Sequence, residues 1–142
     1  MDNLFNTQVQ MALAPIDANG GAVTPLAIDT LGFNALSILI LVGNLAADMT
    51  ALKLQECETS AGSYTDVTGG AFVAFPLAAT GDGKIWRFNV KLAGARKRFY
   101  KVAGTAGAGA SLIGMVAILG RANNLVPNTA AGSGCFEAPV NL

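Results

Sequence analysis

The sequence predicts an all-β fold, a single-domain antiparallel β-sandwich or jelly roll of about eight short strands. Short apolar segments recur about every 8 to 15 residues, and turns rich in Gly, Pro and Asn separate them. No segment keeps the 3.6-residue apolar period of an amphipathic helix. The 142 residues suit one domain with its own core. We expect the sandwich over residues 1–120, including a short N-terminal arm at 1–6, and an extended C-terminal arm at 121–142.

The first three strands are expected at residues 7–14, 22–28 and 34–42. Pro25 removes a backbone donor from the second of these, which predicts an edge strand or a bulge. The third contains an unbroken apolar run at 38–42, rich in Ile, Leu and Val. Such a run predicts a strand that is covered on both faces.

The next strands frame a polar segment. Residues 50–57 alternate, with Leu52 and Leu54 on one face and polar side chains between them. Residues 58–70 are rich in Gly, Ser and Thr and are predicted as a loop. A short strand is expected at 71–75, because a proline follows it directly.

The clearest strand signal lies at residues 84–92, which alternate strictly between apolar and polar side chains over seven residues. Its apolar face carries Trp86, Phe88, Val90 and Leu92. Strands at 99–104 and 111–120 follow, and the last of these is apolar on both faces. The Gly- and Ala-rich segment 104–110 between them is predicted as a loop, because a phosphate-binding loop would have to open a helix.

The composition favours a binding or structural role over catalysis. Charged residues are 13% of the chain, hydrophobic residues are 52%, and nine basic residues balance nine acidic ones. These values exclude a disordered chain and a globally basic nucleic-acid binder. Histidine is absent, and Cys57 and Cys135 lack metal-binding spacing, so we expect no catalytic residues, metal or cofactor. A neutral surface with so few charges is typical of a chain that associates with a partner.

No membrane segment or secretion signal is expected. Residues 1–6 are acidic and polar, where a signal peptide needs a positive start and an apolar run. The most apolar stretch, at 31–47, is interrupted by Asn34, Ser37 and Asn44 and is too short to span a bilayer. We therefore expect synthesis in the cytoplasm and no membrane partner.

The charges are unevenly distributed along the chain. Residues 1–71 hold seven acids and one base, a net charge of −6, and residues 72–142 hold eight bases and two acids, a net charge of +6. The two halves would cancel each other within one sandwich, or they would pair between neighbouring copies. Both arrangements fit the sequence.

One basic cluster, Arg96, Lys97 and Arg98, precedes the aromatic pair Phe99 and Tyr100. Basic residues interleaved with aromatic ones can bind single-stranded nucleic acid. This is a single cluster in a neutral chain, which favours a salt-bridged protein contact instead. We expect no nucleic-acid partner.

Four segments of the chain resemble small structural proteins of tailed bacteriophages that decorate or cement the capsid. They are ALKLQE at 51–56, TGDGKIWRFNV at 80–90, RKRFYKV at 96–102 and AILGRA at 117–122. The resemblance covers about residues 50–122. It implies a β-sandwich or jelly-roll protein in the virion, seated on the capsid surface as a dimer or trimer that clamps neighbouring major capsid subunits.

Both termini carry apolar anchors without a strand pattern, and we expect them to act as clamps. The residues expected at a protein interface are Leu4, Phe5, Arg96, Lys97, Arg98, Arg121, Leu125, Val126, Phe136, Val140 and Leu142. The alternative is a carbohydrate- or receptor-binding β-sandwich module of a phage tail or fibre. In that module Trp86 or Tyr64 would stack on sugars, although alternate aromatic residues on a strand, such as Trp86 and Phe88, are more typical of a core.

Overall fold

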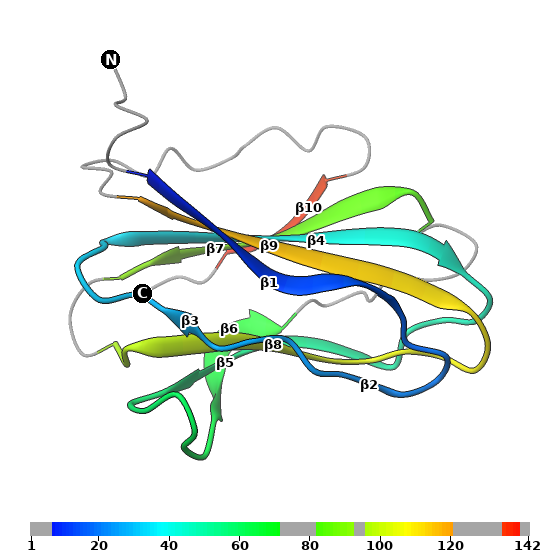
Figure 1. The fold of residues 1–142 in the computed structure, drawn as a ribbon, viewed down its shortest axis with the longest axis horizontal. Coiled ribbons are helices and arrows are strands. Elements are labelled where there is room, and N and C mark those ends of the chain that lie inside the picture. Colours follow the sequence, from blue (N-terminus) through cyan, green and yellow to red (C-terminus); the bar gives the residue numbers. More distant parts are fainter. Residues whose placement is uncertain (1–6, 72–81, 93–95, 121–134, 140–142) are drawn as a thin grey trace.

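The structure is a computed structural model that describes residues 7–71, 82–92, 96–120 and 135–139. Its described part contains strands and no helix, so no helix there is long and apolar enough to cross a membrane. The strands form two sheets that pack face to face (Figure 1). The predicted all-β sandwich is therefore confirmed.

The first sheet has five strands in the order β1-β9-β4-β7-β10. Neighbouring strands run antiparallel, except that β10 runs parallel to β7. In chain order these strands are β1 (Thr7–Asp17), β4 (Ala35–Leu45), β7 (Lys84–Lys91), β9 (Ser111–Gly120) and β10 (Cys135–Pro139).

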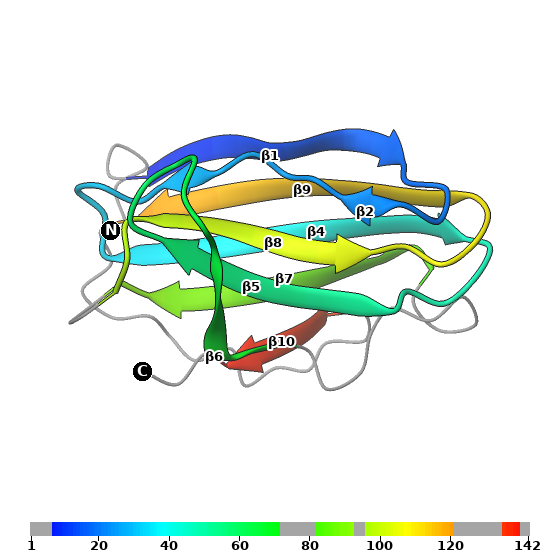
Figure 2. The ribbon, with the colours of Figure 1, turned by 90° about the horizontal axis from the view of Figure 1, so that it is seen from below.

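The second sheet has the order β2-β8-β5-β6, and a further short strand, β3, also pairs with β8. Figure 2 shows this sheet in front of the first. Its strands are β2 (Ala22–Val23), β3 (Ile28–Asp29), β5 (Ala51–Cys57), β6 (Thr65–Ala71) and β8 (Phe99–Thr105).

The core lies between the two sheets and is built by period-2 alternation on nearly every strand. The inward side chains of β4 and β7 are fully or almost fully buried, as the alternation at 84–92 predicts. Facing side chains from the second sheet complete one continuous cluster. Its largest fully buried members include Leu36, Ile38, Ile40, Leu52, Leu54, Phe88, Val90, Tyr100, Met115 and Leu119.

The prediction that residues 38–42 are covered on both faces is wrong for the outer face. Ile38, Ile40 and Val42 point into the core and are buried. Leu41 points away from it and stays exposed, and Leu39 is only half-buried. The apolar run reflects one face packed in the core and one apolar face turned outward.

The predicted loop at 58–70 is also partly wrong, because β6 begins at Thr65 and pairs with β5. Val67 is the buried apolar side chain of this strand, while its polar side chains face solvent. Gly69 has a positive φ of 75°, and the pairing with β5 shifts register nearby. An irregular, mostly polar edge strand gives no alternating apolar signal. The strand expected at 71–75 lies outside the described residues beyond Ala71.

Two other segments differ from the expected strands. The strand expected at 22–28 is divided into β2 and β3, on either side of Pro25, which fits the predicted irregularity. In the expected C-terminal arm, five residues form β10 on the edge of the first sheet. The rest of that arm and the N-terminal residues 1–6 lie outside the described residues.

The loop at 106–110 connects the two sheets, since β8, which extends to Thr105, belongs to one sheet and β9 to the other. Gly107 lies directly against the backbone of Ala47 and Asp48, and a Cβ atom there would overlap the Asp48 carbonyl oxygen. Glycine is required at this position because only glycine allows two backbones to approach so closely. The small residues of this loop therefore serve packing.

Candidate interaction surfaces

The basic cluster leads into β8, and its charges are used within the chain. Arg98 donates two hydrogen bonds to the Asp29 carboxylate, from Nε at 2.8 Å and from Nη2 at 2.6 Å. Its guanidinium also lies over the Phe99 ring, 5.0 Å from the centroid. The hydrogen bonds from Arg98 hold the pKa of Asp29 below its usual range. The pair joins β3 to the start of β8.

Arg96 lies beside a second acid, Glu56 on β5, with Nη1 3.6 Å from Oε2. The same oxygen accepts a hydrogen bond of 3.0 Å from the hydroxyl of Tyr100. Burial, followed by the neighbouring Glu56 charge, raises the pKa of Tyr100 well above its ordinary value. The phenol therefore stays protonated and acts as a permanent donor to Glu56.

Lys97 and Lys53 form contacts with β6, which lies at the edge of the second sheet. Lys97 Nζ donates to Thr65 Oγ1 at 2.9 Å. On the outer side of the second sheet, Lys53 pairs with Asp66 at 2.7 Å, and Gln55 donates to the same carboxylate at 2.7 Å. These contacts, led by Lys53, lower the pKa of Asp66.

The two oppositely charged halves of the sequence meet inside one molecule. Two of the ion pairs, Arg96–Glu56 and Arg98–Asp29, join residues 72–142 to residues 1–71. These contacts show internal cancellation of charge, one of the two arrangements that the sequence allows. The contacts of the basic cluster connect neighbouring strands of one molecule. Its expected role at a protein interface stays a prediction.

The other expected interface residues are placed only in part. Phe136 lies on β10, where its backbone pairs in register with Trp86 of β7. The remaining expected contacts lie outside the described residues: Leu4, Phe5, Arg121, Leu125, Val126, Val140 and Leu142. Their role at an interface remains a prediction.

The aromatic residues considered for sugar stacking have structural contacts. Trp86 and Phe88 are buried in the core, as strand aromatics usually are. Tyr64 is half-buried, with Lys101 Nζ 4.1 Å from the centroid of its ring and its hydroxyl donating to the Ser60 carbonyl at 3.0 Å. Trp86 therefore cannot stack on a sugar, and one face of the Tyr64 ring is already occupied.

Within the described ranges, no group of three or more Cys, Asp and Glu side chains is close enough to hold a metal ion. Cys57 is a free thiol buried under the loop that follows β5, and its Sγ lies where a Cβ on Gly62 would fall. This close contact fixes the loop against the sheet.

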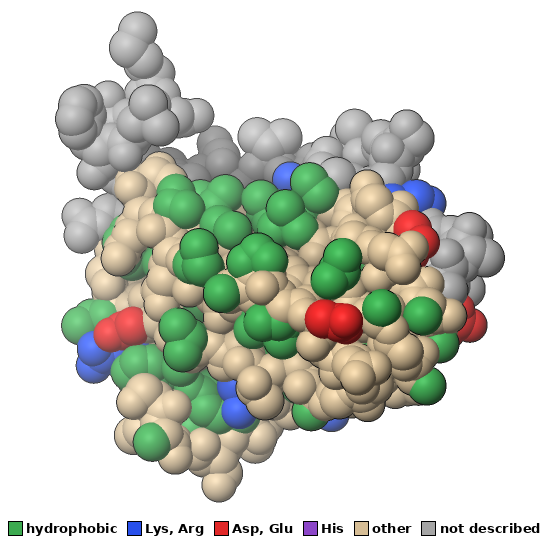
Figure 3. Space-filling model, turned by 45° about the vertical axis from the view of Figure 1, so that its right-hand side comes forward, with side chains coloured by type: hydrophobic (Ala, Val, Ile, Leu, Met, Phe, Trp, Pro, Cys, Tyr) green, Lys and Arg blue, Asp and Glu red, His purple; other side chains and the backbone are tan. Residues whose placement is uncertain are grey.

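One exposed surface was not expected from the sequence, and it lies on the first sheet. We call it the outer face and define it as the side chains of β1, β9, β4 and β7 that point away from the second sheet. Figure 3 shows hydrophobic side chains gathered in the upper half of the view. The five most exposed large hydrophobic residues of the outer face are Val9 (67%), Met11 (58%), Leu112 (48%), Leu41 (44%) and Ile85 (39%).

Comparison with protein-family models finds no match to this chain, and comparison with curated proteins finds none either. The surfaces are therefore interpreted from their own residues. The second sheet carries paired charges on its outer side, and the first sheet carries exposed apolar side chains. The largest apolar patch on a protein surface is often functional.

Proposed function

We propose that the protein is a structural protein of a phage virion that binds the outside of the capsid and stabilises contacts between major capsid subunits. Its partners in this proposal are the major capsid protein and other copies of itself. The observation that carries the proposal is the exposed apolar outer face on a sandwich whose basic cluster pairs internally, because such a face is typical of a protein that works in an assembly with other copies and partners. The resemblance of residues 50–122 to phage decoration proteins is the reason that the proposal names a phage capsid as the partner.

A cementing role needs surface and repetition rather than a reactive group. Each contact buries apolar area that contributes roughly 25 cal/mol per Å². A capsid presents the same site many times, so a modest contact made at two neighbouring subunits at once gains from multivalency. A rigid two-sheet scaffold limits the conformational entropy lost on binding.

The test is co-sedimentation of the purified protein with phage heads that lack it, followed by imaging of the bound shells. We expect saturable binding at a fixed ratio to the capsid subunits and added density on the outer surface. Protein that stays in the supernatant at every concentration would overturn the cement role.

A matched pair of variants tests the expected N-terminal clamp. Phe5→Asp should weaken capsid binding, because it places a charge where an apolar anchor is expected. Gln8→Asp, three residues along on β1, is the control, because Gln8 is exposed and already polar. Equal binding by both variants would exclude the clamp.

A further inference from the structure

We propose that the outer face of the first sheet is a two-fold interface with a second copy of this chain. This inference stands on the outer face alone and does not depend on a capsid partner. In this proposal, a second copy of the chain covers the most apolar exposed surface of the described residues.

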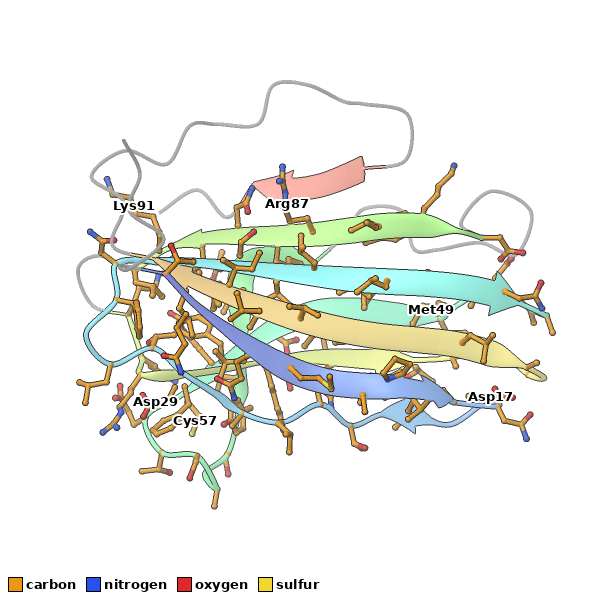
Figure 4. All side chains as sticks on the ribbon, turned by 45° about the horizontal axis from the view of Figure 1, so that its top comes forward. Asp17, Asp29, Met49, Cys57, Arg87 and Lys91 are labelled. Atoms are coloured by element: carbon orange, nitrogen blue, oxygen red, sulfur yellow. The ribbon has the colours of Figure 1, made fainter. Side chains whose placement is uncertain are left out.

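The part of the outer face formed by β1, β9 and β4 is unusual in its lack of charge. Strands β1, β9 and β4 contain a single charged residue, Asp17, at the last position of β1. Figure 4 shows Asp17 at that end, while Arg87 and Lys91 lie on β7, away from β1 and β9. A two-fold axis brings each patch against its own copy, so like charges would repel each other there. An uncharged patch avoids this repulsion.

The shape of the outer face is also suited to self-association. A pocket of about 310 Å³ opens on it, lined by residues of β1, β4 and β9, among them Met11, Pro15, Leu41, Gly43, Leu112 and Gly114. The pocket lies where β1 is irregular and where two glycines leave room between larger side chains. Its volume is about twice the ~150 Å³ that holds a benzene molecule in a protein interior.

Projecting side chains lie next to this pocket on the same face. Val9 and Met11 stand out from β1 and are the two most exposed apolar residues of the outer face. A two-fold arrangement of two β1 strands places these side chains of each copy over the pocket of the other. Projection and pocket on one patch are what an isologous interface requires.

The area available approaches what such a contact needs. The five most exposed side chains of the outer face present roughly 500 Å² of apolar surface, near the upper end for the largest patch on a monomer. A stable interface buries about 800 Å² on each partner, and its centre is the most apolar part. Half-buried neighbours such as Leu39, Val116 and Ile118 extend the patch toward that size.

The second sheet gives a contrast that favours this choice of face. Its outer side carries Lys53, Gln55 and Asp66, which pair with one another. Those groups already have hydrogen-bonding partners, and burying them would cost desolvation energy. Self-association through the first sheet avoids that cost.

The test measures the mass of the full chain by sedimentation or light scattering over a wide range of concentration. We expect wild-type protein to have twice the 14.4 kDa mass of one chain. Met11→Asp should weaken the dimer more than about a hundredfold, because it buries two unpaired carboxylates at the interface. Leu31→Asp is the matched control, since Leu31 lies outside the outer face and is more exposed than Met11 (67% against 58%), and it should remain a dimer.

A second variant approaches the same interface through the pocket. Gly114→Leu fills it from β9, where a Cβ meets only Pro15 at 3.4 Å or more, so the fold should accept it. It should also yield monomers, and circular dichroism should show the same strand content. A wild-type monomer at all concentrations, or an oligomer that neither Met11→Asp nor Gly114→Leu dissociates, would overturn the proposal. Neither result bears on capsid binding, which the co-sedimentation measures separately.

Discussion

Replacing Tyr100 by phenylalanine tests the buried hydrogen bond between β8 and β5. The ring is fully buried, so Tyr100→Phe keeps its packing and removes only the hydroxyl that donates to Glu56 at 3.0 Å. A hydrogen bond to a charged group contributes about 1.5–3 kcal/mol to stability. We expect the free energy of unfolding at pH 7 to fall by that amount, measured by denaturant titration.

The same variant has a pH signature that a simple packing defect lacks. In the folded protein the pKa of Tyr100 is raised above its ordinary value of 10.0 by burial and by Glu56. The stability that this shift supplies is fully present below pH 10 and is lost as the pH rises above it, because the unfolded chain then releases the proton first. The wild type should therefore lose about 1.4 kcal/mol from this group by pH 11, since each pKa unit corresponds to 1.36 kcal/mol.

The variant has no such group, so the difference between the two proteins should shrink by the same ~1.4 kcal/mol between pH 9 and pH 11. Tyr64 and the lysines are present in both proteins and cancel in the comparison. Tyr64→Phe is the control for the loss at pH 7 alone, because its hydroxyl bonds the carbonyl of an exposed loop, while burial also raises the pKa of Tyr64. A difference that stays constant from pH 9 to pH 11 would refute the raised pKa, and no loss at pH 7 would refute the hydrogen bond.

Two further predictions concern backbone packing and the surface ion pair. Gly107→Ala should destabilise the fold by about 2 kcal/mol or more, because its Cβ overlaps the Asp48 carbonyl oxygen, whereas Gly120→Ala meets no atom within 4 Å and should change little. Equal denaturation midpoints would contradict this. Arg98→Ala should raise the pKa of Asp29 toward its ordinary value of 3.8, as read from the carboxyl chemical shift during an NMR titration. An unchanged titration curve would show that Arg98 does not lower the pKa of Asp29.

Strands with strict alternation could be predicted from the sequence, and those without it could not. Residues 84–92 alternate because one face of β7 fills the core, and the structure places Trp86 and Phe88 there. Among the side chains of β6 that the structure describes, Val67 is the buried apolar one, and Asp66 bonds Lys53 and Gln55 on β5. Edge strands of this kind are held by pairing with a neighbour, which leaves little trace in local composition.

The outer face was only half predictable. The sequence shows that residues 38–42 and 111–120 are apolar on both faces. It cannot show whether the second face is covered by the same chain, because that depends on which strands pair. Similarly, the oppositely charged halves allow either internal cancellation or pairing between copies, and they do not identify Asp29 as the partner of Arg98, which lies 69 residues away.

The pairing of β1 with β9 also bears on how the chain folds. The first strand forms its ladder with nearly the last one, from Thr7 against Gly120 to Asp17 against Leu112. During synthesis β1 is made about 100 residues before β9, so this apolar strand stays unpaired until residues 111–120 have been made. Ladders between such distant segments close slowly, because the entropy of a long loop is lost before any contact forms. In newly made chains, β9 therefore has an unpaired edge for a time. During that time it can pair with β1 of the same molecule or with β1 of a neighbouring molecule.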